Sequence, residues 1–149
     1  MYHNHSELWG PVWSWTVETG THALRIIFAG IFDRYPNAKL VLGHMGETLP
    51  YQLWRFDSRW AISNRMDMTL ERAPSEYLKR NFWCTTSGVC SDEPLRCAID
   101  ALGADRVMFS VDYPFEQSKE AGDWIGAAPL SDDERAMVYR DNAVRLLKL

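Results

Sequence analysis

The chain has 149 residues, of which 46% are hydrophobic and 24% charged, so it can bury one sizeable core and is not compositionally disordered. Its net charge of −4 and the absence of any block of Lys or Arg argue against a nucleic-acid partner, whose binding surface would be clustered and basic. No apolar run approaches the roughly 18 residues of a membrane-spanning helix, and the polar start lacks the regions of a signal peptide, so we expect a cytoplasmic protein without a membrane partner.

The first predicted elements lead to a short buried strand. Residues 6–11 form a turn-rich segment that no strand precedes, and residues 14–31 carry apolar side chains at helical spacing. The apolar run at residues 39–43 predicts a fully buried parallel strand, because it ends abruptly at a turn signal. Residues 48–64 then predict one long helix with Pro50 in its first turn, and residues 65–74 a surface loop.

The same alternation continues to the carboxyl end. Residues 75–80 predict a short helix, residues 82–86 a second strand, and residues 94–102 a helix that Gly103 closes. A third strand is expected over residues 106–111 and a mixture of loop and helix over 115–128. The last helix, residues 131–147, begins with a capping box made by Ser131 and Glu134.

This order indicates an α/β fold, the carboxyl-terminal portion of a (β/α)8 barrel, with residues 1–149 as one partial barrel domain. A complete barrel needs eight strands and about 250 residues. Three parallel strands cannot close, so either the sequence is part of a longer barrel or a partner covers the open side. The crowded Trp9, Trp13 and Trp15 add exposed apolar surface, and we expect self-association.

The three cysteines suit neither a disulfide framework nor a structural zinc site. Their number is odd, and Cys84, Cys90 and Cys97 lack CxxC spacing. We expect three reduced thiols, mostly buried.

Polar residues follow each predicted strand. His44 and Glu47 come after the first strand, Ser87 and Gly88 after the second, and Asp112 after the third. Because the carboxyl ends of parallel strands meet at one edge, these residues predict one shared pocket. The alternatives are a structural role for His44 and a turn-capping role for Asp112 before the proline that follows.

A series of motifs runs over essentially the whole chain: Glu18–Arg25, Leu42–Glu47 with Leu49–Pro50 and Trp54–Arg55, Thr85–Gly88, Phe109–Glu116, Asn142–Ala143 and Arg145–Leu146. In this order the motifs resemble the carboxyl-terminal half of the amidohydrolase-related metal-dependent decarboxylases, above all those acting on 2,3-dihydroxybenzoate and γ-resorcylate. The resemblance implies a (β/α)8 barrel, a divalent metal (zinc or manganese, with magnesium as a third candidate), non-oxidative decarboxylation of a small aromatic carboxylic acid, and a homo-oligomeric full-length protein.

The resemblance also implies site residues. Asp112 matches a catalytic aspartate that binds the metal, and His44 with Glu47 matches a catalytic dyad in which the carboxylate orients the imidazole. Arg55 matches an arginine near the substrate or the dyad, and Phe115 is expected to contact the substrate.

The family's other metal ligands belong to strands that this sequence does not contain. His3 and His5 imitate an HxH metal pair but follow no strand, so we do not expect them to be ligands, and His22 is expected to be an ordinary helix residue. Three hypotheses therefore remain: a decarboxylase of which this chain is one half, inactive alone; a metal-dependent hydrolase of a lactone or related ring ester; and a non-catalytic half-barrel scaffold.

Overall fold

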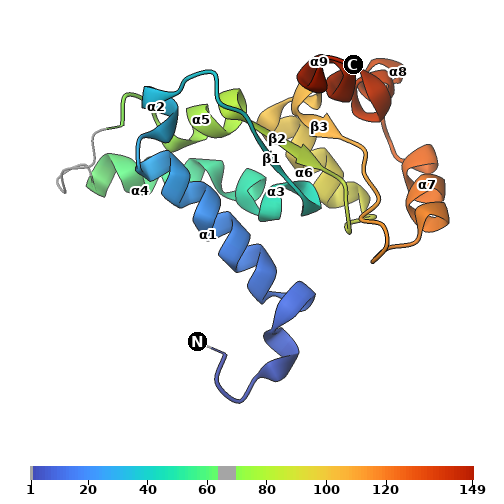
Figure 1. The fold of residues 1–149 in the computed structure, drawn as a ribbon, viewed down its shortest axis with the longest axis horizontal. Coiled ribbons are helices and arrows are strands. Elements are labelled where there is room, and N and C mark those ends of the chain that lie inside the picture. Colours follow the sequence, from blue (N-terminus) through green and yellow to red (C-terminus); the bar gives the residue numbers. More distant parts are fainter. Residues whose placement is uncertain (1, 64–69) are drawn as a thin grey trace.

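The fold of the computed structural model is a short parallel sheet with helices packed on one of its faces (Figure 1). The structure describes residues 2–63 and 70–149. Within them the sheet order is β1–β2–β3, with strands Leu40–Leu42, Phe82–Thr85 and Val107–Met108. Both strand pairs are parallel, and Val41 lies opposite Trp83 and Cys84 opposite Val107. The predicted parallel arrangement is confirmed.

Helices and turns fill the rest of the described chain. Before β1 they are η1 (Ser6–Leu8), η2 (Gly10–Val12), α1 (Ser14–Phe28) and α2 (Ile31–Arg34). Between β1 and β2 they are α3 (His44–Glu47), η3 (Leu49–Gln52), α4 (Leu53–Ser63) and α5 (Pro74–Asn81). After β2 they are α6 (Asp92–Leu102), η4 (Ala104–Arg106), α7 (Ser118–Ala127), α8 (Asp132–Ala136), the π-helical turn η5 (Met137–Asp141) and α9 (Asn142–Leu147).

The core lies on the helix-covered face of the sheet and has two parts. Leu42 and Phe82 pack with Ile27, Phe32 and Leu78 in one cluster. Further along the sheet, a second cluster holds Cys84, Leu95, Ala98, Val107 and Val138. Burying these apolar side chains against α1, α5 and α6 supplies the main driving force for the fold.

The opposite face of the sheet is covered differently. Val41 is 46% exposed there, so the prediction of a fully buried first strand was wrong: within the described chain, little packs on this face of β1. Trp83 is buried, and the cations of Lys39 and Arg106 lie 5.1 Å and 4.4 Å from its ring centroid. This is the face that would line the interior of a closed barrel, and β1 and β3 each pair with β2 alone in the described chain.

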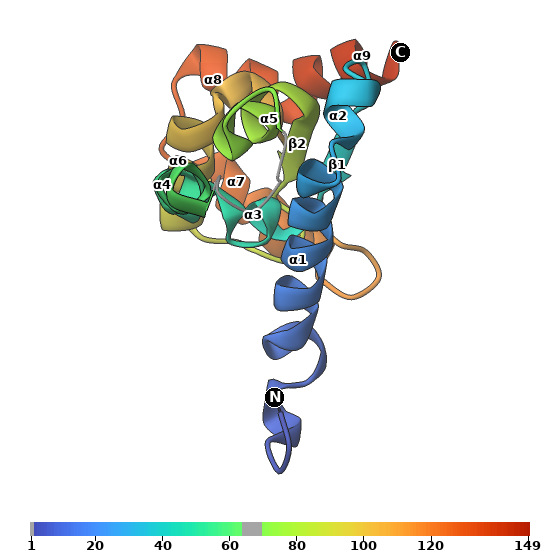
Figure 2. The same ribbon diagram turned by 90° about the vertical axis from the view of Figure 1, so that its left-hand side faces the viewer.

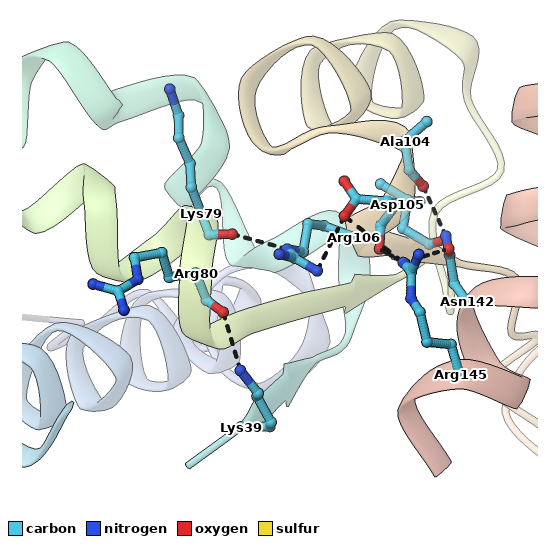
Figure 3. Close-up of polar contacts among 9 residues, drawn as sticks. Lys39, Lys79, Arg80, Ala104, Asp105, Arg106, Asn142 and Arg145 are labelled. Carbon is cyan, nitrogen blue, oxygen red and sulfur yellow. Dashed lines mark hydrogen bonds and ion pairs between the residues drawn. The ribbon is translucent and has the colours of Figure 1, made fainter. Parts of the chain in front are cut away.

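Side chains tie the amino-terminal ends of the strands together (Figure 3). Lys39 donates to the Arg80 carbonyl, and Arg106 donates to the Lys79 carbonyl at 2.8 Å. Asn142, fully buried, donates to the Ala104 and Val107 carbonyls at 2.7 Å each. These contacts leave the carboxyl ends of the strands for the candidate site.

Several predicted boundaries were wrong. The first helix ends at Phe28, not at residue 31, because the chain turns at Ala29–Gly30. The predicted helix 48–64 is interrupted: η3 carries Pro50 and α4 begins only at Leu53. Residues 64–69, the end of that helix and most of the predicted loop, lie outside the described residues.

The third strand and the last helix also differ from the prediction. The expected strand 106–111 pairs with β2 only at Val107 and Met108, because the next backbone N–H groups bond elsewhere: that of Phe109 to the Val138 carbonyl and that of Ser110 to Thr86 Oγ1. The expected helix 131–147 contains the wide π turn η5, although its capping box at Ser131 and Glu134 is confirmed. Of the cysteines, Cys84 is buried but Cys90 is exposed, so the expectation of mostly buried thiols holds only in part.

The amino-terminal arm, residues 2–13, extends away from the sheet and its helices (Figure 2). Trp9 and Trp13 are 61% and 46% exposed, and Trp15 in the first turn of α1 is 57% exposed. The predicted exposure of this Trp cluster is confirmed. Among the described residues, no helix has the length and apolar character needed to span a membrane.

Candidate active site

His44 and Glu47 lie together at the carboxyl end of β1. His44 Nδ1 is 2.8 Å from Glu47 Oε1, and the Glu47 side chain is only 4% exposed. α3 is a tight turn rather than a regular helix, with φ angles of +47° at His44 and +54° at Glu47. Such left-handed conformations cost about 1–3 kcal/mol each for residues other than glycine, so the surrounding packing must hold them. The structure therefore brings the expected dyad together at the cost of local strain.

Asp112 follows β3 and turns toward the same histidine. Its Oδ2 atom is 3.5 Å from His44 Nε2, and its side chain is 33% exposed. Its φ angle of +82° is again a left-handed conformation. Thus the two ring nitrogens of His44 face two different carboxylates, one buried and one open to solvent.

These surroundings alter the proton affinity of His44. Partial burial lowers the pKa of His44, but the hydrogen bond and charge of Glu47, together with those of Asp112, outweigh it and raise the pKa above its usual value. The two carboxylates therefore stabilise the protonated imidazole relative to that of an ordinary histidine.

The loop after β2 joins the other two strand ends. Ser87 Oγ accepts a hydrogen bond from the His44 backbone N–H at 3.3 Å and lies 2.9 Å from Thr85 Oγ1. Thr86 Oγ1 donates to the Ser110 carbonyl at 2.9 Å and accepts from the Ser110 N–H at 3.1 Å. The loop after β2 thus bonds to the backbone of His44 and to that of Ser110, two residues before Asp112. Sequence reasoning placed Ser87 at the pocket edge but missed these supporting bonds.

Gly88 lies directly against both His44 and Asp112. A Cβ atom at Gly88 would be 2.8 Å from His44 Cδ2 and 3.3 Å from Asp112 Oδ2, and its φ angle is +66°. Only glycine leaves the imidazole and the carboxylate room to approach each other here. The sequence indicated Gly88 as a glycine that follows polar residues at the end of a predicted strand.

A largely apolar cavity of about 600 Å³ borders His44. Its lining includes Met45, Pro50, Val89 and Pro94. Asp112 is not part of the lining, so the cavity lies beside the His44–Glu47 dyad and not between the dyad and Asp112.

The other predicted site residues lie apart from this centre. Arg55 is exposed on α4, and no hydrogen bond or ion pair joins it to His44, Glu47 or Asp112 in the described chain. Phe115 is 82% exposed in the loop after β3. Their expected substrate contacts stay predictions. His22 is exposed on α1, as a helix residue, and His5 contacts Glu7 in the arm.

The described residues fit a divalent metal only in part. Asp112 offers a carboxylate at a strand end, a suitable ligand for such an ion. No group of three or more His, Cys, Asp or Glu side chains in residues 2–63 and 70–149 could hold a metal ion. A complete coordination sphere would therefore need ligands from other strands.

Known proteins resemble this chain in sequence and in fold. The chain is 43% identical to the γ-resorcylate decarboxylase of Polaromonas sp. strain JS666 over 150 residues, which cover all of this chain and 46% of that protein. The crystal structure of 2,6-dihydroxybenzoate decarboxylase from Rhizobium matches with a TM-score of 0.93 and 42% identity, over 99% of this chain and 46% of that one.

A dihydroxybenzoic acid decarboxylase from Polaromonas sp. JS666, solved with manganese and the inhibitor 2-nitroresorcinol, matches with a TM-score of 0.94 and 42% identity, over 99% of this chain and 45% of that one. The chain thus spans a little under half the length of these relatives and has the fold of part of their barrel. The sequence profile of the amidohydrolase family matches residues 5–149, and the chain belongs to that family.

Proposed function

We propose that this chain is the acid–base and metal-aspartate half of an enzyme that removes CO2 from a hydroxylated aromatic acid without oxidation, with residues 1–149 as a partial barrel domain. The observation that supports it is the meeting of Asp112 with the His44–Glu47 pair at the carboxyl ends of neighbouring strands. The similarity to γ-resorcylate and dihydroxybenzoate decarboxylases supports the choice of reaction.

The reaction sets what the site must do. The bond between the ring carbon and the carboxylate carbon breaks, CO2 leaves, and the ring carbon takes up a proton. His44 and Asp112 are the candidates to hold and transfer that proton, since His44 Nε2 and Asp112 Oδ2 are 3.5 Å apart. Glu47 keeps the imidazole oriented through Nδ1, which leaves Nε2 directed at Asp112.

A divalent ion, zinc or manganese with magnesium as a third candidate, would have Asp112 as its ligand from this chain. When bound, it would supply Lewis-acid polarisation of the substrate carboxylate and the neighbouring phenolate oxygen. Because Asp112 also contacts His44, the same carboxylate would link the metal to the acid–base pair.

Arg55 and Phe115 are proposed to contact the aromatic acid. A guanidinium suits a carboxylate, and a phenyl ring suits an aromatic face. Both side chains are exposed and therefore accessible to a bound aromatic acid.

Product analysis tests the proposal. A full-length barrel that carries this chain as its carboxyl-terminal half, supplied with manganese or zinc, should convert 2,6-dihydroxybenzoate to resorcinol and CO2. The 149-residue chain alone should release no CO2. A ring ester or lactone opened to an acid without gas would instead identify a hydrolase. Failure of both reactions with metal bound would leave a scaffold and overturn the proposal.

A further inference from the structure

α1 lies unusually close to the segment that carries the candidate dyad. Gly20, buried in the middle of α1, faces the backbone of Glu47. A Cβ atom at Gly20 would be 3.3 Å from the Glu47 carbonyl oxygen and 3.5 Å from Leu49 Cδ2. Glycine in a helix interior destabilises the helix, but at this position the missing side chain lets α1 approach the Glu47 backbone closely.

The Glu47 carboxylate has few direct constraints of its own. Oε1 contacts His44 Nδ1, whereas Oε2 is buried and has no hydrogen-bond partner among the residues that the structure describes. A buried carboxylate normally gathers several donors. With a single hydrogen bond, the direction of the Glu47 side chain depends on where its main chain lies.

Packing behind Glu47 does not replace the absent bonds. A second cavity, of about 230 Å³, lies between α1 and η3, and its lining includes Thr16, Gly20, Glu47 and Gln52. The segment that carries Glu47 therefore borders open space between α1 and η3. Across this space, the approach of Gly20 to the Glu47 carbonyl is a direct contact by which α1 restrains the Glu47 backbone.

We propose that Gly20 is a positioning residue for the dyad: close packing of α1 on the Glu47 carbonyl sets Oε1 against His44 Nδ1. The proposal rests on the proposed acid–base role of His44 and Glu47. It also explains why the Glu18–Arg25 motif, which lies away from the reacting atoms, contains a glycine. A methyl group at Gly20 would push residues 47–48, which have positive φ angles, away from α1.

The variant Gly20→Ala tests this, with Gly122→Ala as its matched control. Both replace a glycine inside a helix, so both raise helix propensity alike, but a Cβ atom at Gly122 would meet no atom within 4 Å. The first measurement is NMR of the 149-residue chain. It follows the Nδ1–H group of His44, whose signal is identified by its disappearance in His44→Asn. In Gly20→Ala this N–H should exchange with water at least about tenfold faster, as expected when a hydrogen bond is lost. In Gly122→Ala it should exchange as in the parent.

Kinetics of the full-length barrel supply the second measurement. Gly20→Ala should lower kcat by about 10- to 100-fold with KM and bound metal nearly unchanged, and should add no further loss to Glu47→Gln, because both changes act through one contact. An unchanged N–H together with parental kcat would overturn the inference. A parent that releases no CO2, combined with an altered N–H in Gly20→Ala, would keep the positioning role and overturn the proposed function instead. If Gly20→Ala does not fold as the separate chain, the comparison with Glu47→Gln in the full-length barrel decides.

Discussion

Replacing Gly88 by alanine should impair catalysis more than folding stability. The added methyl group would be 2.8 Å from His44 Cδ2 and 3.3 Å from His44 Nε2. Since carbon atoms pack best at about 3.5–4.0 Å, the imidazole would have to retreat by roughly 0.7–1.2 Å. That movement separates the ring from Asp112 or from Glu47, because they lie on its two nitrogens.

The two costs can be estimated separately. Alanine at the φ angle of +66° costs about 1–2 kcal/mol of folding stability. Gly88 is exposed, so the fold can otherwise adapt. Displacing a catalytic group by about 1 Å costs about 100-fold in rate, which is about 2.7 kcal/mol in the activation barrier.

The assay is CO2 release by the full-length barrel with its metal content measured, alongside thermal unfolding. Gly122→Ala is the control, because its methyl group would touch nothing within 4 Å and should leave kcat unchanged. A Gly88→Ala protein that keeps kcat within about threefold of the parent would refute the reasoning, since the predicted barrier increase is far larger.

Four further substitutions probe the site and the fold. Asp112→Asn should abolish turnover and weaken metal binding, because an amide is a neutral, poorer ligand; retention of both activities would contradict the assignment. His44→Asn should remove most activity with the metal still bound, and Glu47→Gln should be milder by about one to two orders of magnitude; loss of metal in His44→Asn would make His44 a ligand. Asn142→Ala should lose about 2–4 kcal/mol in urea unfolding, because two buried carbonyls lose their donor, whereas the exposed Asn37→Ala should change little and equal losses would refute this role.

Local sequence patterns were sufficient to predict elements whose structure depends on residues close together in the chain. The strand before His44 and the capping box of Ser131 each depend on residues within one strand or turn, and both were predicted correctly. The start of α5 was missed by one residue, because Pro74 was assigned to the preceding loop but occupies the first turn of the helix. The errors came where distant contacts decide. Nothing in residues 109–111 reveals that they lack a strand partner, and nothing in residues 48–52 reveals that they serve as a tight turn beneath the dyad.

For the candidate site, the sequence was enough to place His44 and Asp112 after short apolar runs, because each run stops at one of these residues. What their side chains contact depends on the tertiary structure. The 3.5 Å approach of His44 to Asp112, the space that Gly88 leaves between them and the contact of Gly20 with Glu47 join residues that are 24 to 68 positions apart in the chain. Such contacts depend on the register of parallel strands and the packing of α1 on the sheet, which no local pattern of side chains encodes.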